Sequence, residues 1–293
     1  MPLASMSKLL AGAQHGGYAV CYCEAWSLES FQAVVEAGED LRAPIIVGFN
    51  GGFLAHPGRA KPENLTCYAG LGLGLRQCKA PVSLLLNETD NLAQIEQGIR
   101  LGFNAVMVEN EQMGLAEYKQ LVKKVVKIAH RYKVSVEAQV GRLSDSSAHS
   151  EAEPTDPAIA RAFAEETEID ALGVAVGNVH ILTSGKAPID FGCLERVRDA
   201  VKIPLVLHGG TGIPLDQLQK CVRLGVAKVN FGTGLKQAYL AALREKMANY
   251  HEPMSPHPFL GMGGANDILI AAREAVKLQV KELLQATGSA GKA

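Results

Sequence analysis

The sequence lacks the features that mark nucleic-acid-binding and membrane proteins. Its 293 residues carry 29 lysines and arginines against 30 aspartates and glutamates, which leaves a net charge of −1. This balance excludes the basic surface that binds nucleic acid and gives no attraction to an anionic membrane. No apolar run approaches the length that spans a bilayer. Residues 1–10 lack the apolar core of a secretory signal, so we expect a cytoplasmic protein.

The cysteines also form no recognisable metal or disulfide pattern. Six are present, and none stands at the paired spacing of a zinc ribbon. Cys21 and Cys23 alternate along one expected strand, where they are badly placed to bridge each other. We therefore expect reduced thiols, as is usual in the cytosol. No linker or low-complexity tract divides the chain, so we expect one domain over residues 1–293.

What the sequence does contain is a regular alternation of short apolar runs and longer amphipathic ones. The apolar runs, read as buried strands, lie at 18–21, 44–47, 82–86, 105–108, 135–139, 171–176, 204–207 and 227–230. The helix patterns lie at 28–37, 63–73, 92–101, 115–131, 156–167, 191–201, 215–224 and 235–249. Eight such units predict an α/β fold, a closed (β/α)8 TIM barrel. An open doubly wound sheet is the alternative, but its first-turn glycine fingerprint is missing.

Several segments fall outside the eight units. Residues 1–14 predict a short N-terminal helix that caps the bottom of the barrel, and residues 267–285 predict an extra C-terminal helix. Residues 141–153 are small and polar, which predicts a mobile loop. The tail that starts at Thr287 is expected to be frayed.

In two segments, an expected apolar strand is followed by glycine and threonine, and a helix pattern begins there. They are residues 205–212, LVLHGGTG, and residues 228–234, KVNFGTG. Glycine lets backbone amides approach an anion closely, and a helix start adds free N–H groups and a favourable dipole. Barrel enzymes often bind phosphate after their seventh and eighth strands, where these segments fall. The pair predicts a site for a phosphorylated substrate.

Two histidines follow neighbouring strand ends in the expected barrel. His208 ends the seventh strand, and His180 lies just beyond the sixth. Because the carboxyl ends of barrel strands form the active site, the two imidazoles are candidates for one metal ion. The alternative is that each histidine only hydrogen-bonds a loop carbonyl.

Carboxylates gather at the ends of other strands. The first strand leads into Glu24, the third ends in Asn87, Glu88 and Asp90, and the fifth carries Glu137. Such groups complete a metal shell or act as general acid or base. Acidic residues after strands also cap the next helix, which is how we interpret Asp90. We favour a functional role for Glu24 and Glu88.

These residues together carry a resemblance to a known family. The matching stretches lie at 16–20, 49–52, 135–138, 174–180, 205–212 and 228–236. Along nearly its whole length the chain resembles the class II, metal-dependent ketose-bisphosphate aldolases, which act on fructose and tagatose bisphosphates. The resemblance implies a (β/α)8 barrel, a divalent metal such as zinc, a phosphorylated sugar substrate and a homodimer or homotetramer.

The resemblance also assigns roles to residues. It implies that His180 and His208 are zinc ligands and that Arg273 reaches the second phosphate, in some members across a dimer interface. Gly177 and Gly209 match positions that contribute to phosphate and monovalent-cation binding. Gly209, Gly210, Thr211, Asn230 and Thr233 resemble the residues that hold the dihydroxyacetone-phosphate moiety, and Asn50 is a further substrate-binding candidate.

The chain departs from the family where the chemistry takes place. Relatives usually have Asp-His at the end of the third strand, where this chain has Asn87 and Glu88. Asn87 cannot move a proton as a carboxylate does. Glu88 still fits a zinc shell, because two histidines and a glutamate form an accepted catalytic set. Glu24 stands where the family usually has asparagine and restores a carboxylate, with Glu137 as a further catalytic candidate and Gln139 replacing a second glutamate.

These observations predict a divergent metal-dependent lyase. It would cleave a phosphorylated ketose by a retro-aldol reaction through a metal-stabilised enediolate. Glu24, Glu88 or a loop acid such as Glu151 or Glu153 would handle protons. One alternative is an isomerase or epimerase that uses the same enediolate, and another is a phosphosugar-binding protein without catalysis.

Overall fold

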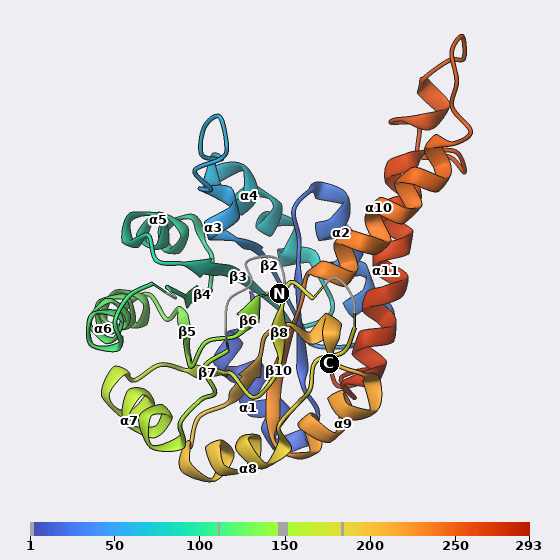
Figure 1. Ribbon diagram of the computed structural model, residues 1–293. Helices are drawn as coiled ribbons and strands as arrows, with labels where there is room; N and C mark the ends of the chain where they lie inside the picture. The colour runs from blue at the N-terminus through green and yellow to red at the C-terminus, as the bar shows by residue number, and fades with distance from the viewer. Residues whose placement is uncertain (1–2, 111, 146–151, 183–184) are drawn as a thin grey trace.

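Eight parallel strands close into a barrel in the computed structural model, which describes residues 3–110, 112–145, 152–182 and 185–293 (Figure 1). The order of neighbours around the barrel is β1-β10-β9-β7-β5-β4-β3-β2. The strands are β1 Val20–Glu24, β2 Ile45–Asn50, β3 Val82–Thr89, β4 Ala105–Val108, β5 Ser135–Val140, β7 Ala171–Val174, β9 Leu205–Leu207 and β10 Val226–Phe231. The predicted TIM barrel is confirmed.

Helices surround the strands as an outer ring (Figure 1). The α-helices are α1 Met6–Gly16, α2 Leu28–Asp40, α3 Gly51–Leu54, α4 Leu65–Leu71, α5 Leu92–Leu101, α6 Leu115–Arg131, α7 Pro157–Thr167, α8 Phe191–Ala200, α9 Leu215–Arg223, α10 Thr233–Met247 and α11 Ile268–Ala286. Short 3₁₀ helices lie at η1 Gly72–Gln77, η2 Gly210–Gly212 and η3 His257–Phe259. Among the described residues, no helix has the length and apolarity to cross a membrane.

Side-chain caps fix where several helices begin. Asp156 and Asp190 accept hydrogen bonds from the first backbone N–H groups of α7 and α8. The same function at α5 belongs to Asn91, whose side chain accepts from the Gln94 N–H. The interpretation of Asp90 as that cap was therefore wrong by one residue. Asparagine and aspartate are both good N-caps, so residue type could not decide between the two neighbours.

The strands separate two apolar layers because successive side chains point to opposite faces. Inward-pointing residues such as Ile46, Leu85 and Met107 form one buried cluster with Met6 and Leu10 of α1. Helix α1 therefore closes the bottom of the barrel, as predicted. The outward-pointing residues pack against the ring of helices. With its lower end plugged, the barrel leaves its carboxyl-terminal end for a binding site.

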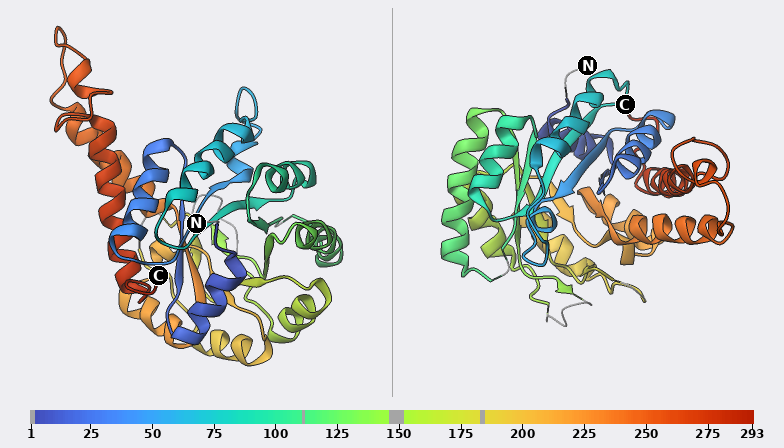
Figure 2. Two further views of the ribbon diagram at one scale, coloured as in Figure 1. Left: turned by 180° about the vertical axis from the view of Figure 1, so that it is seen from behind. Right: turned by 90° about the horizontal axis from the view of Figure 1, so that it is seen from above.

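The C-terminal helix α11 lies alongside α10 and α2. In both views of Figure 2, α10 and α11 run side by side and their connecting loop projects away from the barrel. The expectation of a frayed tail after α11 was wrong. Thr287 and Ser289 are almost fully buried, and the Ala19 N–H donates to the Thr287 carbonyl at 3.0 Å. The tail is held by hydrogen bonds to distant parts of the chain, which its own sequence does not indicate.

The segment expected as a mobile loop contains ordered pairing in its described part. Strand β6, Ser144–Asp145, pairs with β8, Val179–His180, as a separate two-stranded sheet. Arg142 and Glu153 form an antiparallel bridge at the base of the segment. Glu151, one of the candidate loop acids, lies outside the described residues. Two-residue strands are too short to show a pattern in sequence.

Candidate active site

A cavity of about 270 Å³ opens at the carboxyl-terminal ends of the barrel strands. Residues from six strand ends converge there. Most of the predicted site residues line it, namely Glu24, Asn50, Asn87, Glu88, His180, His208, Gly209, Thr211, Asn230 and Thr233. Four predicted residues do not line it, namely Glu137, Gly177, Gly210 and Arg273.

The cavity contains an unusual number of unsatisfied polar atoms. Buried atoms without a hydrogen-bond partner include the Tyr22 hydroxyl, Asn87 Oδ1, His208 Nδ1 and Asn230 Oδ1, and all four residues line the cavity. Buried polar groups normally have partners, because an unpaired one costs about 1–3 kcal/mol. The four atoms therefore point to a polar or ionic ligand at this place.

A local irregularity in β3 brings Asn87 and Glu88 to the same side. Consecutive residues of a regular strand point to opposite faces, so only one of the two would face the cavity. The pairing with β4 shifts register between Leu86 and Thr89, and Glu88 adopts a φ of 52°. Positive φ is strained for a residue with a side chain and tends to occur at functional sites. Both side chains consequently line the cavity.

Glu88, His180 and His208, the three predicted metal ligands, lie close together. Glu88 Oε1 lies 3.4 Å from His208 Nδ1 and 3.8 Å from His180 Nε2. Donor atoms at zinc-ligand distances on a tetrahedron are about 3.4 Å apart, so both separations are close to that value. In the described part of the chain, no three histidine, cysteine, aspartate or glutamate side chains are already placed to hold a metal ion. The donor chemistry of two imidazoles and a carboxylate fits zinc, although the two ring centroids lie 6.5 Å apart.

Two amides hold the Glu88 carboxylate in place. The Asn87 amide donates to Oε1 at 2.7 Å, and the Asn50 amide donates to Oε2. Asn50 Oδ1 in turn accepts from the Phe53 N–H at the start of α3. Burial opposes the ionisation of Glu88, but the neighbouring histidines and the Asn87 amide outweigh it and lower its pKa to about 2. Asn50, predicted as substrate-binding, is thus engaged in positioning Glu88.

Glu137 lies beneath His208 and not in the cavity. Its Oε1 is 2.9 Å from His208 Nε2, and its Oε2 accepts from the Lys228 ammonium at 2.7 Å. Both Glu137 and Lys228 are fully buried. This arrangement leaves His208 Nδ1 facing Glu88, and a carboxylate behind a ligating histidine is the usual support of a zinc ligand. The structure places Glu137, predicted as catalytic, as a positioning residue.

The charges around His208 alternate in sign. Burial opposes ionisation of Glu137, yet Lys228 and His208 outweigh it and lower the Glu137 pKa. Burial also disfavours a charged His208, but Glu137 and Glu88 on its two sides raise the His208 pKa to about 9. Without a metal, the positive charge of the His208 imidazolium offsets the negative charges of Glu137 and Glu88 on its two sides. A divalent cation would replace that charge and release a proton.

Glu24 faces the cavity from β1 and pairs with a lysine of α10. Lys236 Nζ donates to Glu24 Oε1 at 2.7 Å. A Cβ at position 232 would lie 2.4 Å from Glu24 Oε2 and would force the carboxylate to move. Burial raises the Glu24 pKa, and Lys236 opposes this in part. Glu24 is therefore a buried carboxylate with a raised pKa in a cleft, which is typical of acid–base residues.

The two glycine-threonine segments face the same cavity. Gly209 has a φ of 68°, and a Cβ there would lie 2.1 Å from the Val179 carbonyl, which only glycine tolerates. Thr211 Oγ1 accepts from the Gly234 N–H at 3.1 Å and so joins the two segments. Thr233 is the first residue of α10. Free N–H groups at these turns favour an anion.

The other predicted binding residues lie elsewhere. Gly177 packs against the Pro188 carbonyl between β7 and β8, and Gly210 lines a neighbouring cavity with Gln279 of α11. Arg273 forms an ion pair with Glu36 of α2 and donates to Gln32 at 3.0 Å, so it is held on the outer surface of the barrel. The loop acid Glu153 is exposed and pairs with Arg142 at 3.2 Å.

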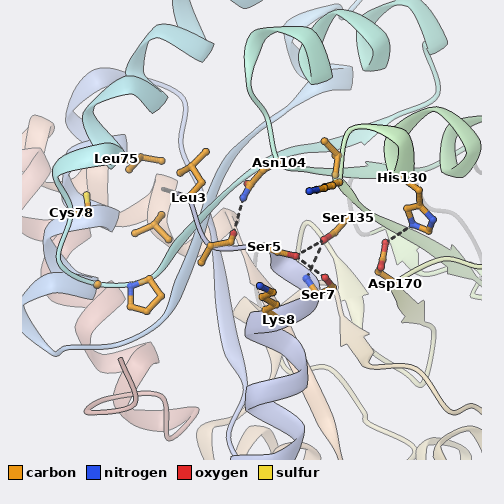
Figure 3. A pocket seen from close by; sticks show the side chains of 16 residues that line it. Leu3, Ser5, Ser7, Lys8, Leu75, Cys78, Asn104, His130, Ser135 and Asp170 are labelled. Carbon is orange, nitrogen blue, oxygen red and sulfur yellow. Dashed lines mark hydrogen bonds and ion pairs between the residues drawn. The ribbon is translucent and has the colours of Figure 1, made fainter. Parts of the chain in front are cut away.

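A larger cavity, of about 750 Å³, lies at the opposite end of the barrel beside α1 (Figure 3). Several of its polar groups hydrogen-bond or pair with one another. His130 pairs with Asp170 at 3.0 Å, the Ser7 N–H donates to Ser135 Oγ, and Asn104 donates to the Ala4 carbonyl. None of the described buried atoms that lack a partner belongs to it. The candidate site is therefore the cavity at the carboxyl-terminal end of the barrel.

Sequence reasoning missed Tyr22 of the cavity lining and three residues that hold the site together. Lys228 supports Glu137, Lys236 pairs with Glu24, and Asn178 donates to the His208 carbonyl at 3.0 Å, which ties the His180 segment to β9. Lys228 could have been found from the sequence. It stands two residues before Asn230 on the same strand, so both side chains face the barrel interior. The partner of Lys236 is 212 positions away in the chain and left no local sign.

Comparisons with known proteins show the family of the chain. The chain matches the family described as fructose-bisphosphate aldolase class-II over residues 4–292. It is similar to the crystal structure of the YdjI aldolase from Escherichia coli K12, with 27% identity, 99% of each chain covered and a TM-score of 0.84.

Two more distant structures share the fold. One is a putative fructose-1,6-biphosphate aldolase from Coccidioides immitis, with 23% identity, 98% of this chain and 97% of that chain covered, and a TM-score of 0.82. The other is the fructose-bisphosphate aldolase Fba from Campylobacter jejuni, with 20% identity, 100% and 97% covered, and a TM-score of 0.80. The chain therefore belongs to the class-II fructose-bisphosphate aldolase family and is an aldolase-like lyase.

Proposed function

We propose that this chain is a zinc-dependent lyase that cleaves a phosphorylated ketose, with Glu24 as its proton-transferring group. One observation carries the proposal. The converging set Glu88, His180 and His208, the Glu24 carboxylate and both glycine-threonine segments line a single cavity of about 270 Å³. A metal donor set, an acid–base group and an anion cradle in one cleft are what a retro-aldol reaction on a sugar phosphate requires.

The phosphate end of the substrate is bound by residues after β9 and β10. Gly209, Gly232 and Thr233 line the cavity. N–H groups and hydroxyls satisfy phosphate oxygens without a paired cation. Asn230 Oδ1, buried without a partner, is available to a substrate hydroxyl beside the phosphate.

Glu88, His180 and His208 would hold the divalent ion. The free atom His208 Nδ1 and the nearby Glu88 Oε1 are suitable donors, and Glu137 keeps Nδ1 directed at the cavity. When bound, the ion supplies Lewis acidity at the ketone oxygen. The ligand side chains themselves fix the position of that oxygen relative to Glu24.

Protons move at Glu24 and not at Asn87. Cleavage requires a base to remove the proton of the hydroxyl next to the breaking carbon–carbon bond, and the released carbon then gains a proton. The Asn87 amide does not ionise and cannot serve as an acid or a base, but its unpaired Oδ1 can accept a hydrogen bond from a substrate hydroxyl. The raised pKa of the buried Glu24 carboxyl suits both steps.

The test combines metal analysis with two assays on dihydroxyacetone phosphate. Zinc-loaded protein should exchange the C3 proton of this compound with solvent deuterium and should also condense it with an aldehyde. In Glu24→Gln both rates should fall about 10²–10⁴-fold, whereas the exposed control Glu117→Gln should keep them.

The outcomes separate the alternatives. Proton exchange without condensation would favour an isomerase or epimerase. A folded chain that binds dihydroxyacetone phosphate but retains no metal and exchanges no proton would favour a binding protein. Equal rates in Glu24→Gln and the unaltered chain would remove Glu24 from the mechanism.

A further inference from the structure

Tyr22, the middle residue of β1, belongs to two layers of the barrel at once. It is part of the buried cluster that Met6 and Leu10 of α1 close from below, and it also lines the active-site cavity. Only 2% of the residue is exposed. Its hydroxyl oxygen is buried and has no hydrogen-bond partner in the described part of the chain. Tyr22 therefore stands at the boundary between the apolar plug and the polar cavity.

A buried tyrosine hydroxyl normally has a partner within the protein. Tyr118 of α6 shows the usual arrangement, because its hydroxyl donates to the Val108 carbonyl at 2.6 Å and accepts from the Gln139 N–H at 3.2 Å. An unpaired buried hydroxyl lowers the free energy of unfolding, and a phenylalanine ring would avoid that cost. The hydroxyl of Tyr22 is therefore suited to a partner that enters the cavity.

The surroundings of Tyr22 keep its hydroxyl protonated. Burial raises the Tyr22 pKa well above its usual value, and the nearby carboxylates Glu24 and Glu88 raise it further. Lys228 Nζ lies 5.0 Å from the centre of the Tyr22 ring, and its proton goes to Glu137 at 2.7 Å. The phenol is consequently a neutral O–H donor among carboxylates.

Other side-chain donors around the cavity already serve the protein. The two amides that face Glu88 donate to its carboxylate, and the Lys236 ammonium donates to Glu24. A ligand oxygen that enters near Glu24 and Glu88 carries partial negative charge, so both carboxylates would repel it. The unused O–H of Tyr22 can offset this repulsion, because it offers a hydrogen bond at the same place.

Tyr22 lies on the side of the cavity that holds the phosphate cradle. In the parallel pairing of β1 with β10, Tyr22 is the register partner of Asn230. Both side chains face the barrel interior from neighbouring strands, so they lie next to each other. Asn230 comes just before Gly232 and Thr233, and its Oδ1 is also buried without a partner. An unused donor and an unused acceptor thus stand side by side near the cradle.

We propose that Tyr22 is a substrate-binding residue whose hydroxyl donates a hydrogen bond to an oxygen of the dihydroxyacetone part of the substrate, next to the phosphate. The proposal rests on the proposed function, because it adds a residue to the same site. Tyr22 keeps its proton throughout, so it makes and breaks no covalent bond. The contact favours a ligand that carries an oxygen at this place over one that offers only a phosphate.

The first experiment compares two ligands on three zinc-loaded chains. Calorimetry measures the affinity of dihydroxyacetone phosphate and of inorganic phosphate for the unaltered chain, Tyr22→Phe and the matched control Tyr118→Phe. In Tyr22→Phe we expect about tenfold weaker binding of dihydroxyacetone phosphate, which is the usual effect of one lost hydrogen bond. Inorganic phosphate, which needs only the cradle, should bind as before. Tyr118→Phe should change neither affinity.

Two results of the calorimetry would overturn the proposal. One is equal affinity of Tyr22→Phe and the unaltered chain for dihydroxyacetone phosphate. The other is equal weakening of both ligands in Tyr22→Phe, which would indicate a general disturbance of the site. An unaltered chain that binds no dihydroxyacetone phosphate would overturn both this proposal and the proposed function.

Urea unfolding without substrate separates a binding role from a structural one. Tyr22→Phe should unfold at the same or a higher urea concentration than the unaltered chain, because the hydroxyl that it removes has no partner. Tyr118→Phe should unfold at a lower concentration, since it leaves the Val108 carbonyl without its donor. A lower midpoint in Tyr22→Phe would show that its hydroxyl is used by the protein itself, which contradicts the proposal.

Kinetic measurements separate failure of this proposal from failure of the proposed function. If the unaltered zinc-loaded chain binds dihydroxyacetone phosphate but neither exchanges its C3 proton nor condenses it with glyceraldehyde, the proposed function fails and the calorimetry still tests Tyr22. If it does react, Tyr22→Phe should lower kcat/KM for dihydroxyacetone phosphate by about tenfold or more and leave the KM of glyceraldehyde unchanged. A raised KM of glyceraldehyde with unaltered kcat/KM for dihydroxyacetone phosphate would place the hydroxyl at the other end of the substrate and overturn the proposal.

Discussion

Lys236 Nζ lies 2.7 Å from Glu24 Oε1, and this pair joins the start of α10 to the end of β1 across the edge of the cavity. The lysine stabilises the ionised form of a carboxylate whose pKa is raised by burial. The pair therefore sets the pH at which Glu24 can accept a proton.

Replacing the lysine should shift the pH dependence of activity. In Lys236→Met the Glu24 pKa should rise further, because the opposing charge is gone while the burial remains. The acidic limb of the kcat/KM profile should move to higher pH. On acidification, the variant should therefore lose activity at a higher pH than the unaltered chain. Lys246→Met, at the other end of the same helix, should not move the limb. An unshifted profile in Lys236→Met would show that Glu24 is not the titrating base.

A methyl group at position 232 should impair the reaction without unfolding the protein. Its Cβ would lie 2.4 Å from Glu24 Oε2 and would force that carboxylate to move. A displacement of about 1 Å at a reacting group costs about 10²-fold in rate, which is the loss that we expect for Gly232→Ala. Gly70→Ala on α4, where a Cβ would meet nothing within 4 Å, is the control. Equal kcat values in the two variants would argue against Glu24.

The buried pair of Lys228 and Glu137 should matter for stability. Lys228→Met leaves the Glu137 carboxylate fully buried without its cation, which should lower the free energy of unfolding by about 3–5 kcal/mol. Urea unfolding measures this loss, and adding Glu137→Gln in the same chain should recover part of it. Lys123→Met, which breaks an exposed pair with Glu166, should cost less than about 1 kcal/mol. A Lys228→Met chain as stable as the unaltered one would contradict the proposed charge balance.

Zinc affinity should depend on Glu88 more than on Glu137. Glu88→Gln removes a charged donor and should weaken binding by more than about 100-fold, whereas Glu137→Gln, acting through His208, should cost about 10–100-fold. Glu88→His introduces the residue that relatives usually carry and should retain zinc. Competition with a chelator of known affinity measures all three variants. Tight zinc binding by Glu88→Gln would exclude Glu88 as a ligand.

Much of the fold follows from local patterns in the sequence. Helices α5 and α6 and strand β4 have the predicted boundaries, since amphipathic periodicity and capping residues act over a few neighbouring positions. The buried tail at Thr287 escaped prediction because its stability comes from a hydrogen bond with Ala19, far away in the chain.

The site was predictable in its residues but not in its geometry. His180, His208 and Glu88 were identified from their places after strands, and the structure brings them together. The register shift in β3 that turns Glu88 to the cavity depends on pairing with β4, which no short pattern reveals. The same limit applies to Arg273, whose position on α11 gave no sign of its pairing with Glu36.

The most direct test of the central claim is the condensation of dihydroxyacetone phosphate with glyceraldehyde, measured on one preparation before and after removal of zinc. We predict product with zinc, no product after chelation, recovery on adding zinc back, and a loss of about 10²–10⁴-fold in zinc-loaded Glu24→Gln. Condensation that persists after chelation, or that is unaffected by Glu24→Gln, would contradict the account.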